Sequence, residues 1–186
     1  MSSSVLCRLL CLSLTLGGSI FLKAAEPLAI ANVQGGLVVQ LGADEAETAS
    51  RLSRTGRYVI HVLDADTTKT EKARKALKAD GVYGLAFAET LTNPAHLPYT
   101  ENVVNVVRLN SLGNTPLTEV LRVLTPRGTL LALPGSGLNT AKLKAAGFDS
   151  ISRTKDRELI ARKPWPKDMD TWSHPRHAAN GNAVSM

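Results

Sequence analysis

Two residues at the ends of neighbouring apolar runs have the types and the spacing of a nucleotide-binding site. Gly42 follows the run LVVQL, Asp64 follows the run YVIHVL, and the two lie 22 positions apart. In an open α/β sheet, the turn after the first strand approaches the ligand, and an acidic residue about 20 positions on holds the ribose hydroxyls. An ordinary strand-end glycine and a surface aspartate would give the same pattern. The strands and helices around this pair must therefore distinguish a binding site from an ordinary strand end.

Thiol and metal chemistry have few candidates. Both cysteines, Cys7 and Cys11, lie in the N-terminal apolar segment, so the rest of the chain has no thiol for catalysis, a disulfide or a metal. His174 and His177 are three positions apart and could bind a metal together with a carboxylate. Pro175 and the lack of a framing helix favour a packed or solvated tail instead. We predict no metal site.

The charge balance does not indicate a nucleic-acid partner. The 186 residues include 22 Lys and Arg against 16 Asp and Glu, which gives a net charge of +6. Four lysines, Lys69, Lys72, Lys75 and Lys78, spread around one expected helix and are interleaved with Glu71. No aromatic stacking positions lie among them. We interpret this surface as a solvated helix face and expect no binding of nucleic acid.

The N-terminus has the pattern of an export signal. Arg8 precedes an apolar stretch over 9–22, which is shorter than the ~20 residues of a membrane-spanning helix. Small residues follow directly at Ala24-Ala25, and a cleaner A-x-A pattern lies at Ala29-Ile30-Ala31. We predict a signal peptide over 1–25, with cleavage as late as residue 31. The protein would be periplasmic or secreted and would meet a membrane only through this signal; an uncleaved anchor is the alternative.

Strand and helix patterns alternate after the signal. Apolar runs typical of buried parallel strands lie at 37–41, 58–63, 85–88, 103–109 and 129–133. Residues 148–153 and 158–162 form a predicted hairpin around a polar turn. The alternation predicts an α/β fold of Rossmann-like type. Its sheet would be doubly wound and mostly parallel, with a C-terminal antiparallel hairpin.

Helix signals lie between these runs. Asp44 and Glu47 form a candidate capping box for a helix that reaches about residue 53. Thr67 or Thr68 can open a second helix, which Gly81 ends. Two more helices are expected, over 117–124 and over 139–146. Pro126 ends the first of them.

Several stretches along residues 35–164 resemble the class I S-adenosylmethionine-dependent methyltransferase domain. They are LVVQLGADEAETASRL, VIHVLDAD, HLPYTENVVNVV, EVLRVLTPRGTLLAL and AAGFDSISRTKDRELIARKP. The resemblance implies a methyltransferase-like domain over 35–163, a sheet of seven strands with the last antiparallel, and S-adenosylmethionine over the turn after the first strand. Carried over residue by residue, it places Gly42, Asp44, Asp64 and Asn93 at the cofactor.

The turn after the first strand departs from the family pattern. The chain reads GADEA from Gly42, with alanine and glutamate where further glycines are usual. Added side chains would crowd the amino-acid end of the cofactor. The charge of Glu45 is unfavourable beside the methionine carboxylate unless a cation compensates it. Asn93 stands where the family has an acidic residue for the adenine amine, and its amide oxygen can still accept that hydrogen bond.

These departures favour a pseudoenzyme in which methyl transfer is weak or lost. The segment at the end of the fourth strand, Arg108-Leu109-Asn110-Ser111-Leu112, contains no catalytic set for methyl transfer, and no Ser or Asp partner is identifiable for His61 or His96. Catalytic residues are therefore left unassigned, and the methyl acceptor, a small molecule or a protein, is unknown. Export would also separate the protein from S-adenosylmethionine, which is made inside cells.

Residues 164–186 form a linker or tail. Their run WPKDMDTWSHPRHAANGNAV resembles the segment that joins such methyltransferase-like domains to pyrroloquinoline-quinone-type β-propellers in exported bacterial proteins. The resemblance implies a chain truncated before a propeller and a propeller domain as its partner. The alternative function is thus a non-enzymatic binding or docking module, originally attached to a quinone-type propeller protein.

Overall fold

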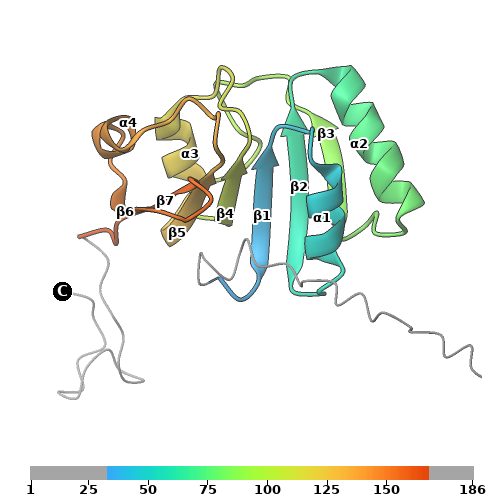
Figure 1. Ribbon diagram of the computed structural model, residues 1–186, viewed down its shortest axis with the longest axis horizontal. Helices are drawn as coiled ribbons and strands as arrows, with labels where there is room; N and C mark the ends of the chain where they lie inside the picture. The colour runs from blue at the N-terminus through green and yellow to red at the C-terminus, as the bar shows by residue number, and fades with distance from the viewer. Residues whose placement is uncertain (1–32, 168–186) are drawn as a thin grey trace, which may run out of the picture.

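Seven strands form one sheet in the computed structural model, which describes residues 33–167 (Figure 1). Their spatial order is β3-β2-β1-β4-β5-β7-β6. β1 to β5 run parallel to one another, and β7 runs antiparallel to both β5 and β6. The predicted sheet, mostly parallel with a C-terminal antiparallel hairpin, is confirmed. The strands are β1 (Gly36–Leu41), β2 (Tyr58–Asp64), β3 (Ala86–Thr90), β4 (Val104–Leu109), β5 (Leu124–Ala132), β6 (Asp149–Arg153) and β7 (Leu159–Arg162).

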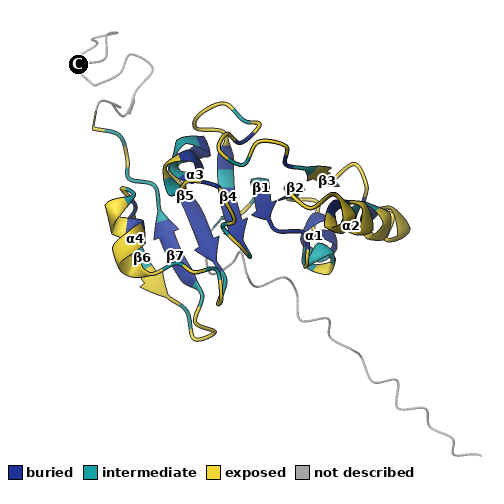
Figure 2. Cartoon of the chain, turned by 90° about the horizontal axis from the view of Figure 1, so that it is seen from above, coloured by how far each residue is buried: buried dark blue, intermediate teal, exposed yellow. Residues whose placement is uncertain are grey.

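The described helices cover both faces of this sheet (Figure 2). α1 (Ala46–Ser53) and α2 (Thr67–Ala79) pack on β1, β2 and β3, while α3 (Leu117–Val123) and α4 (Thr140–Ala145) belong to the opposite layer. Neighbouring residues of β1 separate accordingly: Val38 packs in the α1–α2 layer and Val39 in the α3–α4 layer, and neither is exposed. Burial on both faces explains why these strands are continuous apolar runs rather than alternating ones.

One of the two predictions about helix starts is wrong, and the other is confirmed. Glu45, not Asp44, holds the N-cap position of α1, and no side-chain hydrogen bond caps this helix. Asp44 instead forms an ion pair of 3.0 Å with Lys69 of α2. α2 is capped by Asp66, whose Oδ1 accepts hydrogen bonds from the N–H groups of Thr68 (2.8 Å) and Lys69 (3.3 Å). α2 begins at Thr67, as the sequence predicts, and Asp66 supplies the cap that precedes it.

The fifth strand starts earlier than its apolar run. β5 begins at Leu124, which pairs with Val104 before a register shift, and the main pairing with β4 resumes from Thr129. Pro126 lies inside this irregular first part. Pro126 therefore lies between α3 and the regular part of β5, as the sequence predicts. It does not prevent Leu124, two residues before it, from pairing with β4.

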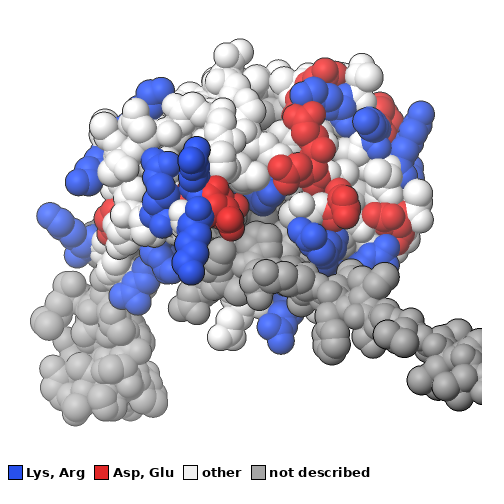
Figure 3. Space-filling view, viewed as in Figure 1, with Lys and Arg blue, Asp and Glu red and all other residues white. Residues whose placement is uncertain are grey.

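The connection between β3 and β4 contains no helix. It runs from the edge of the sheet across β2 and β1, and Leu97 at its middle is completely buried. At that edge, the guanidinium of Arg74 on α2 donates two hydrogen bonds to the backbone oxygen of Ala88 in β3, at 3.1 and 2.8 Å. Acidic and basic side chains are interspersed over the part of the surface that carries α1 and α2 (Figure 3).

Several predictions concern residues outside the described part of the chain. The signal over 1–25, the alternative cleavage at residue 31, and His174 and His177 of the tail all lie there. Within residues 33–167, no helix is long and apolar enough to cross a membrane. The same residues contain no group of three or more His, Asp or Glu side chains arranged to hold a metal ion.

Candidate functional site

The candidate site is the turn that follows β1, where the carboxyl ends of three strands meet. The N–H of Gly42 donates to the oxygen of Leu63 in β2 (2.8 Å), and the N–H of Asn110 donates to the oxygen of Leu41 (3.0 Å). Gly42 has a φ of +103°, and a Cβ at this position would lie 3.0 Å from the Cβ of Asn110. Only glycine combines this backbone conformation with this close approach.

The structure brings Gly42 and Asp64 together, as their spacing predicts. Oδ2 of Asp64 accepts a hydrogen bond of 2.9 Å from the N–H of Ala43, directly after Gly42. Oδ1 accepts another of 2.9 Å from the N–H of Asp66. The carboxylate thus ties the turn after β1 to the segment that opens α2. Both of its oxygens already accept backbone hydrogen bonds, although each has lone pairs to spare.

A buried arginine underlies the same turn. The side chain of Arg108 in β4 is only 5% exposed, and its Nη2 forms an ion pair with Glu45, which is 40% exposed. Nη1 donates to Oε1 of Gln40 (3.3 Å) and to Oδ1 of Asn110 (3.0 Å). The amide of Gln40 in turn donates to the backbone oxygen of Gly42 (3.0 Å). Glu45 therefore has the compensating cation that its place in the turn requires.

Asp44 lies on the outer rim of the turn. Its ion pair with Lys69 joins the turn to α2, and both side chains are largely in solvent, at 60% and 47% exposed. The hydrogen bond and charge of Asp44 raise the pKa of Lys69. An exposed pair of this kind contributes little stability. Asp44 is consequently near the predicted site, but it is occupied by a surface partner.

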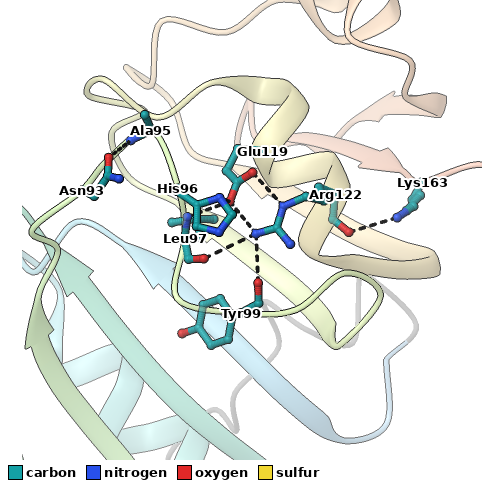
Figure 4. A network of polar contacts seen from close by, with 8 residues as sticks. All are labelled: Asn93, Ala95, His96, Leu97, Tyr99, Glu119, Arg122 and Lys163. Carbon is teal, nitrogen blue, oxygen red and sulfur yellow. Dashed lines mark hydrogen bonds and ion pairs between the residues drawn. The ribbon is translucent and has the colours of Figure 1, made fainter.

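Asn93 lies in the β3–β4 connection, with its side chain turned into its own loop (Figure 4). Its Oδ1 accepts a hydrogen bond from the N–H of Ala95 (3.1 Å), and its backbone oxygen accepts one from His96 (3.1 Å). The side chain is exposed and forms an Asx turn of the usual type. Its contacts are thus local and do not reach Gly42, Asp44 or Asp64.

Glu119 and Arg122 of α3 hold the β3–β4 connection against the domain (Figure 4). Oε1 of Glu119 accepts from the N–H of Leu97 (2.7 Å), and Arg122 donates to both oxygens of Glu119, through Nε to Oε2 (2.8 Å) and Nη2 to Oε1 (2.6 Å). Nη2 also donates to the backbone oxygen of Tyr99 (2.9 Å). Hydrogen bonding from Arg122 is the main cause that lowers the pKa of Glu119.

A second polar group lies where Tyr99 of this connection meets β2 and β3. The Tyr99 hydroxyl is 2.5 Å from Nδ1 of His61, and Nε2 of His61 is 3.3 Å from Oε2 of Glu89. Burial lowers the pKa of His61, against the smaller opposing effect of Glu89, and raises the pKa of Tyr99. His61 is half-buried, as its position inside a strand predicts. Its contact with Tyr99 joins the connection to the sheet.

Comparison with known proteins identifies the fold. No family model and no curated protein matches the chain. Among solved structures, the [4+2]-cyclase SpnF superposes with a TM-score of 0.63 at 17% identity, over 76% of this chain and 81% of that one. An S-adenosylmethionine-dependent methyltransferase from Aquifex aeolicus gives a TM-score of 0.57 at 13% identity, over 74% of this chain and 87% of that one.

A third neighbour was solved with a relevant ligand. The geranyl diphosphate C-methyltransferase from Streptomyces coelicolor, in complex with Mg²⁺, geranyl diphosphate and S-adenosyl-L-homocysteine, gives a TM-score of 0.57 at 12% identity, over 75% of this chain and 77% of that one. The chain has the class I methyltransferase fold. In this fold, the turn after β1, with Gly42, Asp64, Glu45 and Arg108, is the region to which the sequence resemblance assigns the cofactor.

The linear sequence does not mark Arg108 as the residue that organises this turn. Arg108 is the next-to-last residue of the apolar run VVNVVRL, and this run predicts a strand without assigning Arg108 a role in the site. A single arginine near the end of an otherwise apolar buried strand is the signal that could have revealed it, because a buried guanidinium requires an acidic or polar partner. The position of Glu45 in the turn calls for a compensating cation, but nothing in the linear sequence indicates that Arg108 is this cation.

Proposed function

We propose that the chain is a methyltransferase-fold domain in which S-adenosylmethionine-dependent transfer is weak or lost. The ion pair between Glu45 and Arg108 carries this proposal. By resemblance, the turn after β1 receives the amino-acid end of the cofactor, and glycines leave room for it. Here a carboxylate of the protein lies in that turn and neutralises the buried cation beneath it. The residues present therefore do not fit the amino-acid end of S-adenosylmethionine.

The adenosine end is altered less. Asp64 and Asn93 keep oxygens that can accept hydrogen bonds from ribose and adenine, but both already accept them from nearby N–H groups. A bound nucleoside would have to share or displace these bonds. One of the fold neighbours is named as a [4+2]-cyclase, so the fold itself does not require methyl transfer. These observations support a domain that kept the architecture and lost the transferase activity.

Titration calorimetry of the mature domain with S-adenosylmethionine and S-adenosylhomocysteine tests the proposal. We expect no heat and no thermal shift at millimolar ligand. Binding that is abolished by Asp64→Ala and retained by Asp149→Ala would overturn the proposal, because it would show a working cofactor site. Asp149 is an exposed residue of β6 and serves as the matched control.

A docking role is the second candidate, and the attachment of the tail favours it. Lys163, directly after β7, donates from Nζ to Oδ1 of Asn102 (2.7 Å) and to the backbone oxygens of Leu124 (2.8 Å) and Arg122 (3.2 Å). The guanidinium of Arg127 lies 4.9 Å from the ring centre of Trp165. A linker fixed at its start suits a module that holds a following domain in place.

The proposed partner of this module is a quinone-type β-propeller. Sequencing of the DNA downstream of the codon for Met186 tests that association directly. An in-frame stretch that encodes repeated four-strand units would support it. A downstream region without such units in any frame would contradict it, while leaving the proposed loss of methyl transfer untouched.

A further inference from the structure

The positive charge of the protein is concentrated in one part of the fold. Residues 126–167 contain nine Lys and Arg against three Asp and Glu, whereas residues 33–125 contain ten of each kind. The excess of six in residues 126–167 equals the net charge of +6 of the whole chain. In Figure 3, Lys and Arg gather over the part of the molecule that carries β5, β6 and β7, with few acidic side chains among them.

The cations of this part lack the acidic partners that other cations have. The ion pairs among the described residues all join side chains between positions 44 and 122. Lys144, Arg153, Lys155 and Arg157 are exposed, and none of them forms an ion pair with a described carboxylate. Asp156 lies in the same turn as Lys155 and offsets only one of these charges. The four cations are therefore available to an external anion.

α4 and the hairpin of β6 and β7 present these cations on one layer. Leu143 of α4, Ile151 of β6 and Leu159 of β7 pack in the same core cluster, so the helix lies beside the hairpin. The exposed cations of the two elements lie on the outside of this layer. We call them the basic face, which consists of Lys142, Lys144, Arg153, Lys155 and Arg157.

The basic face has no apolar centre. Among residues 33–167, the exposed large apolar side chains are Val59, Tyr83, Leu85, Val103 and Trp165. Only Trp165 lies within residues 126–167, and it follows the end of β7 opposite to the turn that carries Lys155. A protein interface usually has an apolar core, and single-stranded nucleic acid stacks on aromatic rings. The basic face instead suits a purely electrostatic contact.

We propose that the basic face binds the anionic headgroups of a phospholipid membrane. Each Lys or Arg close to such a surface strengthens binding by about fivefold, and the contact requires no fixed register between protein and headgroups. The predicted export would bring the protein to a membrane surface, which favours lipid over nucleic acid as the ligand. The inference goes beyond the proposed function, which concerns the cofactor turn and the tail. It also adds a second membrane contact to the predicted signal.

Sedimentation of the mature protein, residues 26–186, with lipid vesicles tests this proposal. We expect binding to vesicles of phosphatidylcholine with about 30% phosphatidylglycerol, and no binding to vesicles of phosphatidylcholine alone. Binding should weaken as the salt concentration rises from about 0.05 to 0.2 M, because salt screens exposed charges. The double variant Lys144→Glu/Lys155→Glu should bind the anionic vesicles at least tenfold more weakly, which is a lower bound of about tenfold for two reversed charges.

Lys72→Glu/Lys75→Glu is the matched control. Both lysines are exposed on α2, and their replacement changes the net charge by the same amount. This control should keep most of the affinity for anionic vesicles. The Tm of each variant checks its folding. If Lys144→Glu/Lys155→Glu does not fold, Lys144→Gln/Lys155→Gln replaces it and should bind more weakly than Lys72→Gln/Lys75→Gln.

Three results would overturn the proposal. The first is no binding of the wild type to anionic vesicles, and the second is an equal loss of affinity in both double variants, because net charge alone would then explain binding. The third is tighter binding to double-stranded DNA or to poly-L-glutamate than to the vesicles at the same salt concentration. This result would assign the basic face to nucleic acid or to an acidic protein. Binding of S-adenosylmethionine would contradict the proposed function only, because β4, β5 and β7 separate β6 from β1.

Discussion

The carboxylate of Asp64 accepts a hydrogen bond of 2.9 Å from the backbone N–H of Ala43. This contact joins the end of β2 to the turn after β1, and the second oxygen of Asp64 joins the same turn to Asp66 before α2. Asp64 is the residue that sequence spacing identifies as a ribose ligand. In the structure its two oxygens hold the turn after β1 against the segment that opens α2.

Replacement of Asp64 should therefore reduce stability even without ligand. Asp64→Ala leaves two N–H groups without their acceptor, and hydrogen bonds to a charged group contribute about 1.5–3 kcal/mol. We expect a loss of about 2 kcal/mol in the free energy of unfolding in urea. Asp64→Asn, which keeps one acceptor oxygen, should lose less, and Asp149→Ala should be neutral. Equal values for Asp64→Ala and Asp149→Ala would contradict the structural role.

The two members of the Glu45–Arg108 pair should respond unequally to removal. Glu45→Ala strands a buried guanidinium, whereas Arg108→Met leaves a carboxylate that can turn into solvent. We expect urea unfolding to show a loss of about 2 kcal/mol for Glu45→Ala and a smaller loss for Arg108→Met. Comparison of each with the double variant gives their coupling. A larger loss for Arg108→Met would show that packing of the arginine, rather than its charge, dominates.

Glu119 should control the exchange of one backbone amide in the β3–β4 connection. The N–H of Leu97 donates to Oε1 of Glu119 and lies at a buried position. Glu119→Ala removes that acceptor and frees Arg122, so hydrogen exchange at Leu97 should accelerate at least tenfold by two-dimensional NMR. Exchange in β1 should change little, because its hydrogen bonds lie elsewhere in the sheet. Unchanged protection at Leu97 would contradict the role of Glu119 in holding the β3–β4 connection.

Acid should act first on the structure around His61. Burial keeps the folded pKa of His61 below its unfolded value, so the unfolded chain binds the proton more readily as the pH falls through about 6.5. The free energy of unfolding should therefore decrease from pH 7.5 to 5.5, and His61→Gln should flatten this slope. Glu89→Gln should extend the decrease to lower pH, because Glu89 favours the protonated form. An identical slope in wild type and His61→Gln would refute the assignment.

Export remains a prediction that fractionation can check. Expression of the full chain in a bacterium should place the protein outside the cytoplasm. N-terminal sequencing of that material should begin at Glu26, or at Asn32 if cleavage occurs at the later site. A product that stays in the cytoplasm and retains Met1 would contradict the signal peptide.

The architecture could be predicted further than the site. Strands such as β1 and β2 are buried on both faces, so their runs are unambiguous, and the polar turn before Glu158 indicates the hairpin. The pairing of Gly42 with Asp64 also followed from spacing, since carboxyl ends of adjacent parallel strands meet. The partnership of Glu45 with Arg108 did not, because two residues 63 positions apart share no local pattern.

Side-chain competition explains the remaining differences. Asp44 has the residue type of an N-cap, but Lys69 of α2 comes within reach only after the sheet has formed. Asn93 stands at the position expected for a residue that binds the adenine base. Its side-chain oxygen instead accepts a hydrogen bond from the N–H of Ala95 in the same loop. Both outcomes depend on contacts in the folded chain, which the helix and turn propensities of single residues do not predict.

The two hydrogen bonds from Arg74 to Ala88 have a consequence for the behaviour of the protein in concentrated solution. β3 is an outermost strand, and its outward carbonyls would otherwise invite a strand of another molecule to extend the sheet. Arg74 covers one of these carbonyls with a charged group that a neighbouring strand would have to displace. The same side chain that packs α2 against the edge should therefore also oppose self-association through β3.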